Sequence, residues 1–141
     1  HFSATPSAPA FAAYRAAHTP TDAFPKPHAI IALSALVAPT DEEAQFLAQS
    51  QQLMWALFMS GEIRKLVPPE EASRHVYTDH QRRIIENQSK LWIVGSPETV
   101  KREIEAKVTE SGADEVMVTT TAWDYDMRLR SYRLLAEAFG L

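Results

Sequence analysis

The sequence predicts an α/β fold in which strands and helices alternate around a parallel sheet. The first observation is size and composition: 141 residues, 45% hydrophobic and 23% charged, are typical of one globular domain with a sizeable core. The second observation is that three short apolar or β-branched runs are each followed by a helix-start signal. This order favours parallel strands joined by right-handed crossover connections.

The first 27 residues predict one short helix between two loops. They hold five of the nine prolines, and the alanine-rich stretch Ala8–Ala17 lies between those prolines. Phe11 and Tyr14 fall on the apolar face of this helix, and the prolines from 20 to 27 prevent any further helix.

The longest apolar run, Ala29–Ala38, fits either a strand or a helix by its pattern. We interpret it as a strand covered on both faces, because a helix-start signal follows at once. Thr40–Glu43 has the pattern of a capping box, in which Glu43 reaches back to the backbone N–H of Thr40. A helix should run from there to near Gly61 and carry five large apolar side chains toward the core: Phe46, Leu47, Met54, Leu57 and Phe58.

Residues 62–89 predict an irregular excursion. Pro68 and Pro69 interrupt it, and no regular period is sustained as far as Tyr77. A second capping-box pattern, Thr78–Gln81, opens a short helix to about Gln88. The excursion is either a lid over a pocket or a surface segment without a catalytic role.

The last fifty residues give the clearest pattern. A short buried strand, Leu91–Val94, is followed by Gly95, by Ser96 as a helix N-cap and by Pro97 at the first helical position. The next helix ends at Ser111-Gly112, and one face of it holds Val100, Ile104 and Val108.

A third strand, Glu115–Thr121, is β-branched and apolar. The final helix follows Trp123-Asp124 and ends at Gly140. The apolar side chains that it carries are Leu129, Tyr132, Leu135 and Phe139.

Composition and charge exclude several classes of protein. The absence of cysteine rules out a disulfide scaffold, a thiolate zinc site and a cysteine nucleophile. A formal charge of −4 with scattered basic residues argues against a nucleic-acid or anionic-membrane surface. No run approaches the roughly 20 apolar residues of a membrane span, and the N-terminus lacks the pattern of a signal peptide. We therefore expect a cytoplasmic protein.

Three strands form a small parallel sheet, and the first predicted helix has no strand before it. A closed (β/α)8 barrel needs about 250 residues, so 141 residues match the trailing part of one. An incomplete barrel would leave strand edges and a core face open.

Three stretches at fixed distances resemble the luciferase-like, flavin-dependent monooxygenases. They are Trp92-Ile-Val-Gly-Ser-Pro-Glu-Thr-Val100, Thr109-Glu-Ser-Gly-Ala-Asp-Glu-Val-Met-Val-Thr-Thr120 and Arg128-Leu-Arg-Ser-Tyr-Arg-Leu-Leu-Ala-Glu-Ala-Phe139. Upstream, His1-Phe2-Ser3 resembles the end of the family's fifth strand, Tyr14-Arg15 its fifth helix, and Val37–Ala44 the end of strand six with its helix. The resemblance covers nearly all of residues 1–141, and 62–89 match least.

The resemblance implies that the chain is one partial domain, about strands 6–8 of a TIM barrel with their helices. It implies reduced FMN, favoured over the deazaflavin F420 and supplied by a separate reductase, reacting with O2 on a small organic substrate. The N-terminal part of the same barrel would hold much of the flavin phosphate site, so this chain alone should be inactive. A homo-oligomer is also expected. The alternative is a non-catalytic α/β module that binds flavin or associates with itself.

Barrel chemistry occurs at the carboxyl ends of the strands, which directs attention to His1, Phe2 and Thr120 as cofactor-binding residues. By resemblance, His1 stands near the flavin ring. Thr119, Thr120 and Thr121 can present hydroxyls to the mouth, but alternation lets at most two of them face inward, and threonine is also a good strand former.

Other polar groups have simpler explanations. Ser96 is either a phosphate donor at a helix N-terminus or a plain N-cap, and its neighbour Glu98 favours the cap. His75 and His80 are five residues apart, off a single helical face, so no metal site is expected there. Asp124 and Asp126 suit an N-cap and a first-turn acid.

Overall fold

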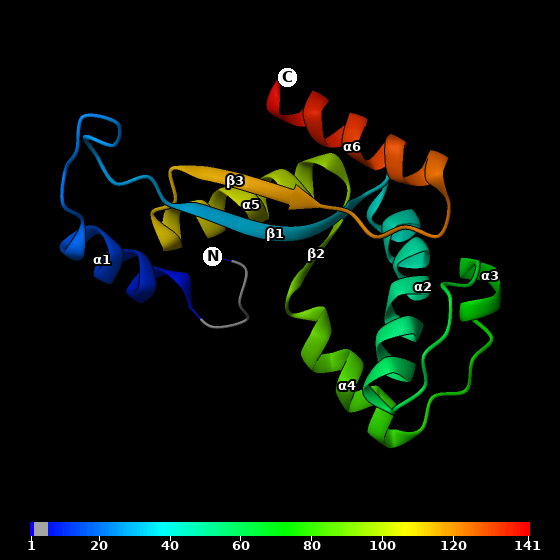
Figure 1. Cartoon of the computed structure of the whole chain (residues 1–141). Helices are drawn as coiled ribbons and strands as arrows, with labels where there is room; N and C mark the ends of the chain where they lie inside the picture. Colours follow the sequence, from blue (N-terminus) through cyan, green and yellow to red (C-terminus); the bar gives the residue numbers. More distant parts are fainter. Residues whose placement is uncertain (2–5) are drawn as a thin grey trace.

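The computed structural model describes residue 1 and residues 6–141 and contains six helices and three strands within them. Figure 1 shows their arrangement. In chain order they are α1 (Ser7–Ala17), β1 (Ile30–Val37), α2 (Asp41–Met59), α3 (Pro69–Ala72), α4 (Asp79–Ser89), β2 (Trp92–Gly95), α5 (Pro97–Ser111), β3 (Glu115–Thr119) and α6 (Tyr125–Phe139). The alternation of helices and strands predicted from the sequence is confirmed.

The three strands form one parallel sheet with the order β2-β1-β3. Strand β1 pairs along its first half with β3, from Ile30 opposite Glu115, and along its second half with β2, to Val37 opposite Gly95. Three consecutive barrel strands would place β2 in the middle. The observed order therefore differs from the one that strands 6, 7 and 8 would have, and the central position belongs to the longest and most apolar strand.

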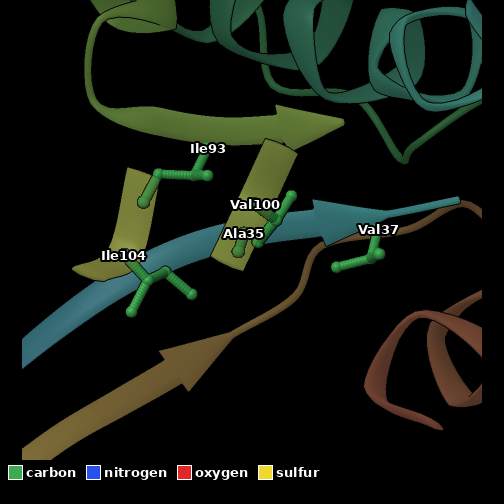
Figure 2. Packing of buried hydrophobic residues seen from close by; sticks show 5 residues of the cluster. All are labelled: Ala35, Val37, Ile93, Val100 and Ile104. Atoms are coloured by element: carbon green, nitrogen blue, oxygen red, sulfur yellow. The ribbon is translucent and has the colours of Figure 1, made fainter. Parts of the chain in front are cut away.

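One face of the sheet is covered by helices. Ala35 and Val37 of β1 and Ile93 of β2 pack against Val100 and Ile104 of α5, as Figure 2 shows. Leucines 134 and 135 of α6 pack against the same cluster. At the other end, Phe11 of α1 covers Ile31. The predicted core stripe of α5 is thus confirmed.

The opposite face of the sheet is open in part: Leu36 of β1 on this face is 1% exposed, and we call the open part, formed by Ala32, Ser34, Met117 and Thr119, the bare face. Side chains alternate along a strand, so Glu115, Met117 and Thr119 of β3 point away from the helix-covered side. All three are exposed, and Met117 retains 53% of its accessible surface. Ala32 and Ser34 of β1 on this face are only half-buried. The run at 29–38, which the sequence predicts to be covered on both faces, has no exposed residue, and the exposed positions of this face belong to β3.

Helix α2 packs through alanines and leucines: the predicted burial of Leu57 is confirmed, and that of Phe46 and Phe58 is wrong. Ala44, Ala48 and Ala56 are fully buried, whereas Phe46 is exposed and Phe58 keeps 52% of its surface. The alanine stripe brings the helix close to its neighbours, and the two phenylalanines fall outside that stripe. Thr40 caps the helix as predicted, but the Glu43 carboxylate accepts from Arg130 of α6 at 3.0 Å.

The other helix boundaries follow the predicted caps. Thr78 and Gln81 form the reciprocal capping box at α4, and the Asp124 carboxylate accepts from the N–H of Met127 at α6. Gly112 and Gly140 end α5 and α6 in the left-handed region. The predicted burial is wrong for Tyr14, Tyr132 and Phe139, which lie at the rims of their helices and are exposed.

The excursion at 62–89 is more ordered than expected. Residues 62–68 have no regular structure, but α3 and α4 both lie against α2 (Figure 1). Ala72 of α3 is fully buried against Leu53 and Leu57 of α2. Contacts of this kind stabilise the segment at 62–89, although its sequence shows no sustained hydrophobic periodicity. No helix among the described residues combines the length and apolarity needed to cross a membrane.

Candidate functional site

The carboxyl ends of β1 and β2 meet at one edge of the sheet, where Asp41 joins them. Asp41 Oδ1 accepts from the backbone N–H of Ser96 at 2.6 Å, and Oδ2 accepts from the Thr99 hydroxyl at 3.2 Å. The Ser96 hydroxyl also accepts from the N–H of Thr99 at 3.4 Å, which confirms its role as N-cap. The Asp41 carboxylate thus occupies the N-terminal end of α5, where a phosphate would otherwise bind.

Gly95 makes this arrangement possible. A Cβ at position 95 would lie 2.7 Å from Asp41 Oδ1 and 2.7 Å from Thr99 Cγ2. Both distances are shorter than van der Waals contact, so any larger residue would displace the carboxylate that links the two strand ends. The cluster of Asp41, Gly95, Ser96 and Thr99 is therefore a structural joint between β1, β2 and α5.

The hydrogen bond from the Ser96 backbone, followed by those from the Ser96 and Thr99 side chains, holds the pKa of Asp41 below its ordinary value. A carboxyl with a lowered folded-state pKa stabilises the fold above its unfolded-state pKa, and this stabilisation is lost as the pH falls through the folded-state value.

We expect Asp41→Asn to lower the thermal unfolding temperature at neutral pH, because a neutral amide is a weaker acceptor than the carboxylate. The difference from the unsubstituted protein should shrink as the pH falls below the ordinary carboxyl range. Thermal melts between neutral and acidic pH would measure it. Asp22→Asn, in an exposed loop before β1, is the matched control and should leave the profile unchanged. An equal effect of both substitutions at every pH would contradict the stabilising role of the Asp41 carboxylate.

The three threonines after β3 divide between the two faces. Thr120 is buried on the covered side, where its hydroxyl donates to the Ala35 carbonyl at 2.8 Å and its N–H donates to the Tyr132 hydroxyl at 3.0 Å. Thr119 is exposed on the bare face. A flavin-binding role for Thr120 stays a prediction, and its side chain is already engaged in holding β3 to β1. Thr119 is the threonine whose side chain meets the open face.

The backbone of His1 lies beside β1 as a strand would. Its amino group donates to the Ile30 carbonyl at 2.6 Å, and its carbonyl accepts from the N–H of Ala32 at 2.8 Å. The two bonds match a parallel bridge opposite Ile31, so the imidazole lies on the helix-covered side, edge-on to Phe11 at 5.9 Å between centroids. Phe2, the other predicted flavin contact, lies outside the described residues.

The remaining candidates have local roles. His75 Nε2 is 3.3 Å from Gln81 Oε1, and its ring packs edge-on against Tyr77. His80 lies exposed in the first turn of α4. Among the residues that the structure describes, no three His, Cys, Asp or Glu side chains gather as metal ligands. Asp124 is the N-cap of α6 and Asp126 lies in its first turn, as predicted.

The candidate site is therefore the bare face of the sheet, near the carboxyl ends of β1 and β3. Ser34 and Thr119 lie opposite one another there, flanked by Ala32 and Met117. Sequence reasoning missed Asp41, and it named Thr119 only as one of three threonines that could face the mouth. Both follow from one rule, since the carboxyl ends of parallel strands meet at a common edge and side chains alternate along each strand.

Comparison with known proteins gives the relationships of the chain. No family model matches the sequence. The Bacillus subtilis protein YvbT is 32% identical over 139 residues, which are 99% of this chain and 41% of YvbT. YceB from the same organism is 37% identical over 92% of this chain and 39% of its own length. The chain thus spans about two fifths of these relatives.

Two further similarities are to proteins whose names or structures indicate a family and a fold. An Escherichia coli protein named luciferase-like monooxygenase is 26% identical over 121 residues, which are 86% of this chain and 36% of that protein. The crystal structure of apo-MsnO8 superposes with a TM-score of 0.78 at 30% identity, over 96% of this chain and 41% of MsnO8. The chain is therefore a distant homologue of a luciferase-like monooxygenase and shares its mixed α/β fold with part of MsnO8.

Proposed function

We propose that this chain is the C-terminal part of a flavin-dependent monooxygenase of the luciferase-like type, which uses reduced FMN and O2 on a small organic substrate. The single observation that carries the proposal is the similarity to the luciferase-like monooxygenase of Escherichia coli across 86% of the chain. The one-sided sheet supports it independently.

A sheet with helices on one face and an open surface beside β3 on the other suits the wall of a barrel. In a (β/α)8 barrel the helices lie outside, and the inner strand faces meet side chains from the other strands. We assign β1 and β3 to consecutive barrel strands, because they are parallel neighbours across five residue pairs. The two hydrogen bonds of His1 with Ile30 and Ala32 support a preceding barrel strand on the other edge of β1, and in this proposal β2 is an added strand on that edge.

The bare face fits one wall of a flavin ring site. Ala32 and Ser34 are small, Met117 is apolar, and the exposed Thr119 hydroxyl, which donates to the Leu33 carbonyl at 3.5 Å, lies at the carboxyl end of β3. A planar ring system packs well on such a surface. In this proposal, these residues hold the ring in orientation and exclude water from one side of it.

The phosphate of FMN does not fit this chain's strand ends. The N-terminus of α5 already faces the Asp41 carboxylate, and Arg130 is paired with Glu43 at 3.0 Å. The proposal therefore assigns the phosphate to the N-terminal part of the barrel. When bound, reduced flavin supplies the two electrons that let O2 deliver one oxygen atom to the substrate and the other to water.

The test uses the full-length protein with chemically reduced FMN, and separately with reduced F420, under ¹⁸O2 and a panel of straight-chain aldehydes. We expect the full-length protein to bind reduced FMN and to produce carboxylic acids that contain one ¹⁸O atom. The 141-residue chain alone should produce none. Binding of F420 alone would correct the cofactor. A full-length protein that binds neither cofactor would contradict the proposal and favour a non-catalytic module.

A further inference from the structure

A small pocket lies between α2 and the segment that connects it to α4. Its volume is about 170 Å³. The residues that line it come from α2, from the loop after it and from the neighbourhood of α3: Ser50, Leu53, Met54, Leu57, Arg64, Lys65, Val67, Glu71, Arg74 and His75. The floor is buried leucine, and the rim is charged. This pocket plays no part in the function proposed above.

The rim of the pocket is positively charged although the chain as a whole is not. Arg64, Lys65 and Arg74 face a single carboxylate, Glu71, in a chain whose formal charge is −4. Arg64 also reaches the exposed Glu62 carboxylate at 2.8 Å. Lys65 and Arg74 form no ion pair within residue 1 and residues 6–141. Two guanidinium groups and one ammonium group at a common rim are suited to an oxyanion.

Ser50 provides an independent sign of a ligand. Its side chain is 2% exposed, and its hydroxyl is the one buried side-chain polar atom without a hydrogen-bond partner among the residues that the structure describes. A serine in the middle of a helix commonly donates to the carbonyl one turn earlier, and Ser50 does not do so here. Buried polar groups in folded proteins nearly always have a partner, and a ligand atom in this pocket would provide one.

His75 forms part of the wall of the pocket. Its Nε2 lies 3.3 Å from Gln81 Oε1, and its ring packs edge-on against Tyr77 at 4.7 Å between centroids. The α4 capping box holds Gln81 in place, because the same Oε1 accepts from the N–H of Thr78 at 3.0 Å. The α4 capping box thus fixes the His75 side of the pocket, and the irregular segment 62–68 contributes Arg64, Lys65 and Val67 to the rim opposite α2.

We propose that this pocket binds a small anion with a carboxylate or phosphate group. Arg74 and Lys65 hold the oxyanion at the rim, and the Ser50 hydroxyl donates to an oxygen atom at the floor. The volume admits roughly five or six water-sized groups, which suits a small organic acid or inorganic phosphate and excludes a whole nucleotide. The proposed anion site lies apart from the proposed flavin site. A negative result for anion binding therefore leaves the proposed function untouched, and a negative result for flavin binding leaves the anion site untouched.

The first test is calorimetric titration of the full-length protein with acetate and, separately, with inorganic phosphate, against sodium chloride of equal ionic strength. We expect saturable binding of one of these anions, and the two arms distinguish a carboxylate site from a phosphate site. Arg74→Gln should weaken that binding at least about tenfold, because one charge-assisted hydrogen bond is lost. Arg83→Gln, on the exposed side of α4, is the matched control and should leave the affinity unchanged.

The second test is Ser50→Ala, measured as thermal unfolding with and without the anion. Without the anion, the melting temperature should stay the same or rise, because an unpartnered buried hydroxyl has been removed. The increase in melting temperature on adding the anion should be smaller than in the unsubstituted protein. The proposal is overturned if neither anion binds saturably, if Arg74→Gln and Arg83→Gln weaken binding equally, or if Ser50→Ala leaves the anion-dependent shift unchanged.

Discussion

Replacing Gly95 with alanine is expected to lower the free energy of unfolding by about 2–3 kcal/mol. The added Cβ would lie 2.7 Å from Asp41 Oδ1 and 2.9 Å from Thr99 Cβ. The Asp41 and Thr99 side chains cannot move away without cost, because Asp41 accepts hydrogen bonds from Ser96 and from Thr99. The substitution thus forces apart the joint that links the carboxyl ends of β1 and β2 to the start of α5.

Urea unfolding of the full-length protein measures this effect, with Gly61→Ala as the control. Gly61 has a φ of +88° and no atom within 4 Å of an added Cβ, so alanine there meets backbone strain alone. That strain costs roughly 1 kcal/mol. If Gly95→Ala destabilises the protein no more than Gly61→Ala does, the prediction is contradicted, because the close packing at Gly95 would then not exclude a larger side chain.

Local signals predicted the elements well. Ser96 with Pro97 and Asp124 mark the starts of α5 and α6, and each acts through atoms within three residues of itself. The strand assignment of the apolar run at 29–38 was also confirmed, although its pattern fitted a helix equally. Here the capping signal immediately after the run decided between the two.

Packing over long distances was predicted less well. The central position of β1 depends on pairing with β2 and β3, which follow it by more than fifty residues, and no local pattern encodes that order. The exposure of Phe46 and Phe58 has a similar cause. Apolar character alone does not tell which side of α2 meets its neighbours, and the buried side combines alanines with Leu53 and Leu57.

The sequence predicted where the candidate site lies better than it predicted which side chains face it. The carboxyl edge of the sheet was expected to matter, and Asp41, Ser96 and the threonines after β3 do meet there. Their orientation could not be predicted, because a shift of one residue in a strand exchanges its two faces. Thr120 faces the helices and Thr119 faces the open side for this reason.

In the proposed function, the bare face of the sheet forms one wall of the flavin site. The most direct test is Thr119→Trp in the full-length protein, because an indole at this position would occupy the space assigned to the flavin ring. We expect the dissociation constant for reduced FMN, measured anaerobically, to rise by roughly tenfold to a hundredfold.

Thr109→Trp is the matched control, since Thr109 is exposed on α5, and circular dichroism would verify that both variants fold. We expect weakened FMN binding in Thr119→Trp and unchanged binding in Thr109→Trp. Equal FMN affinity in the two folded variants would contradict the proposed flavin site, because the bare face would then lie outside it.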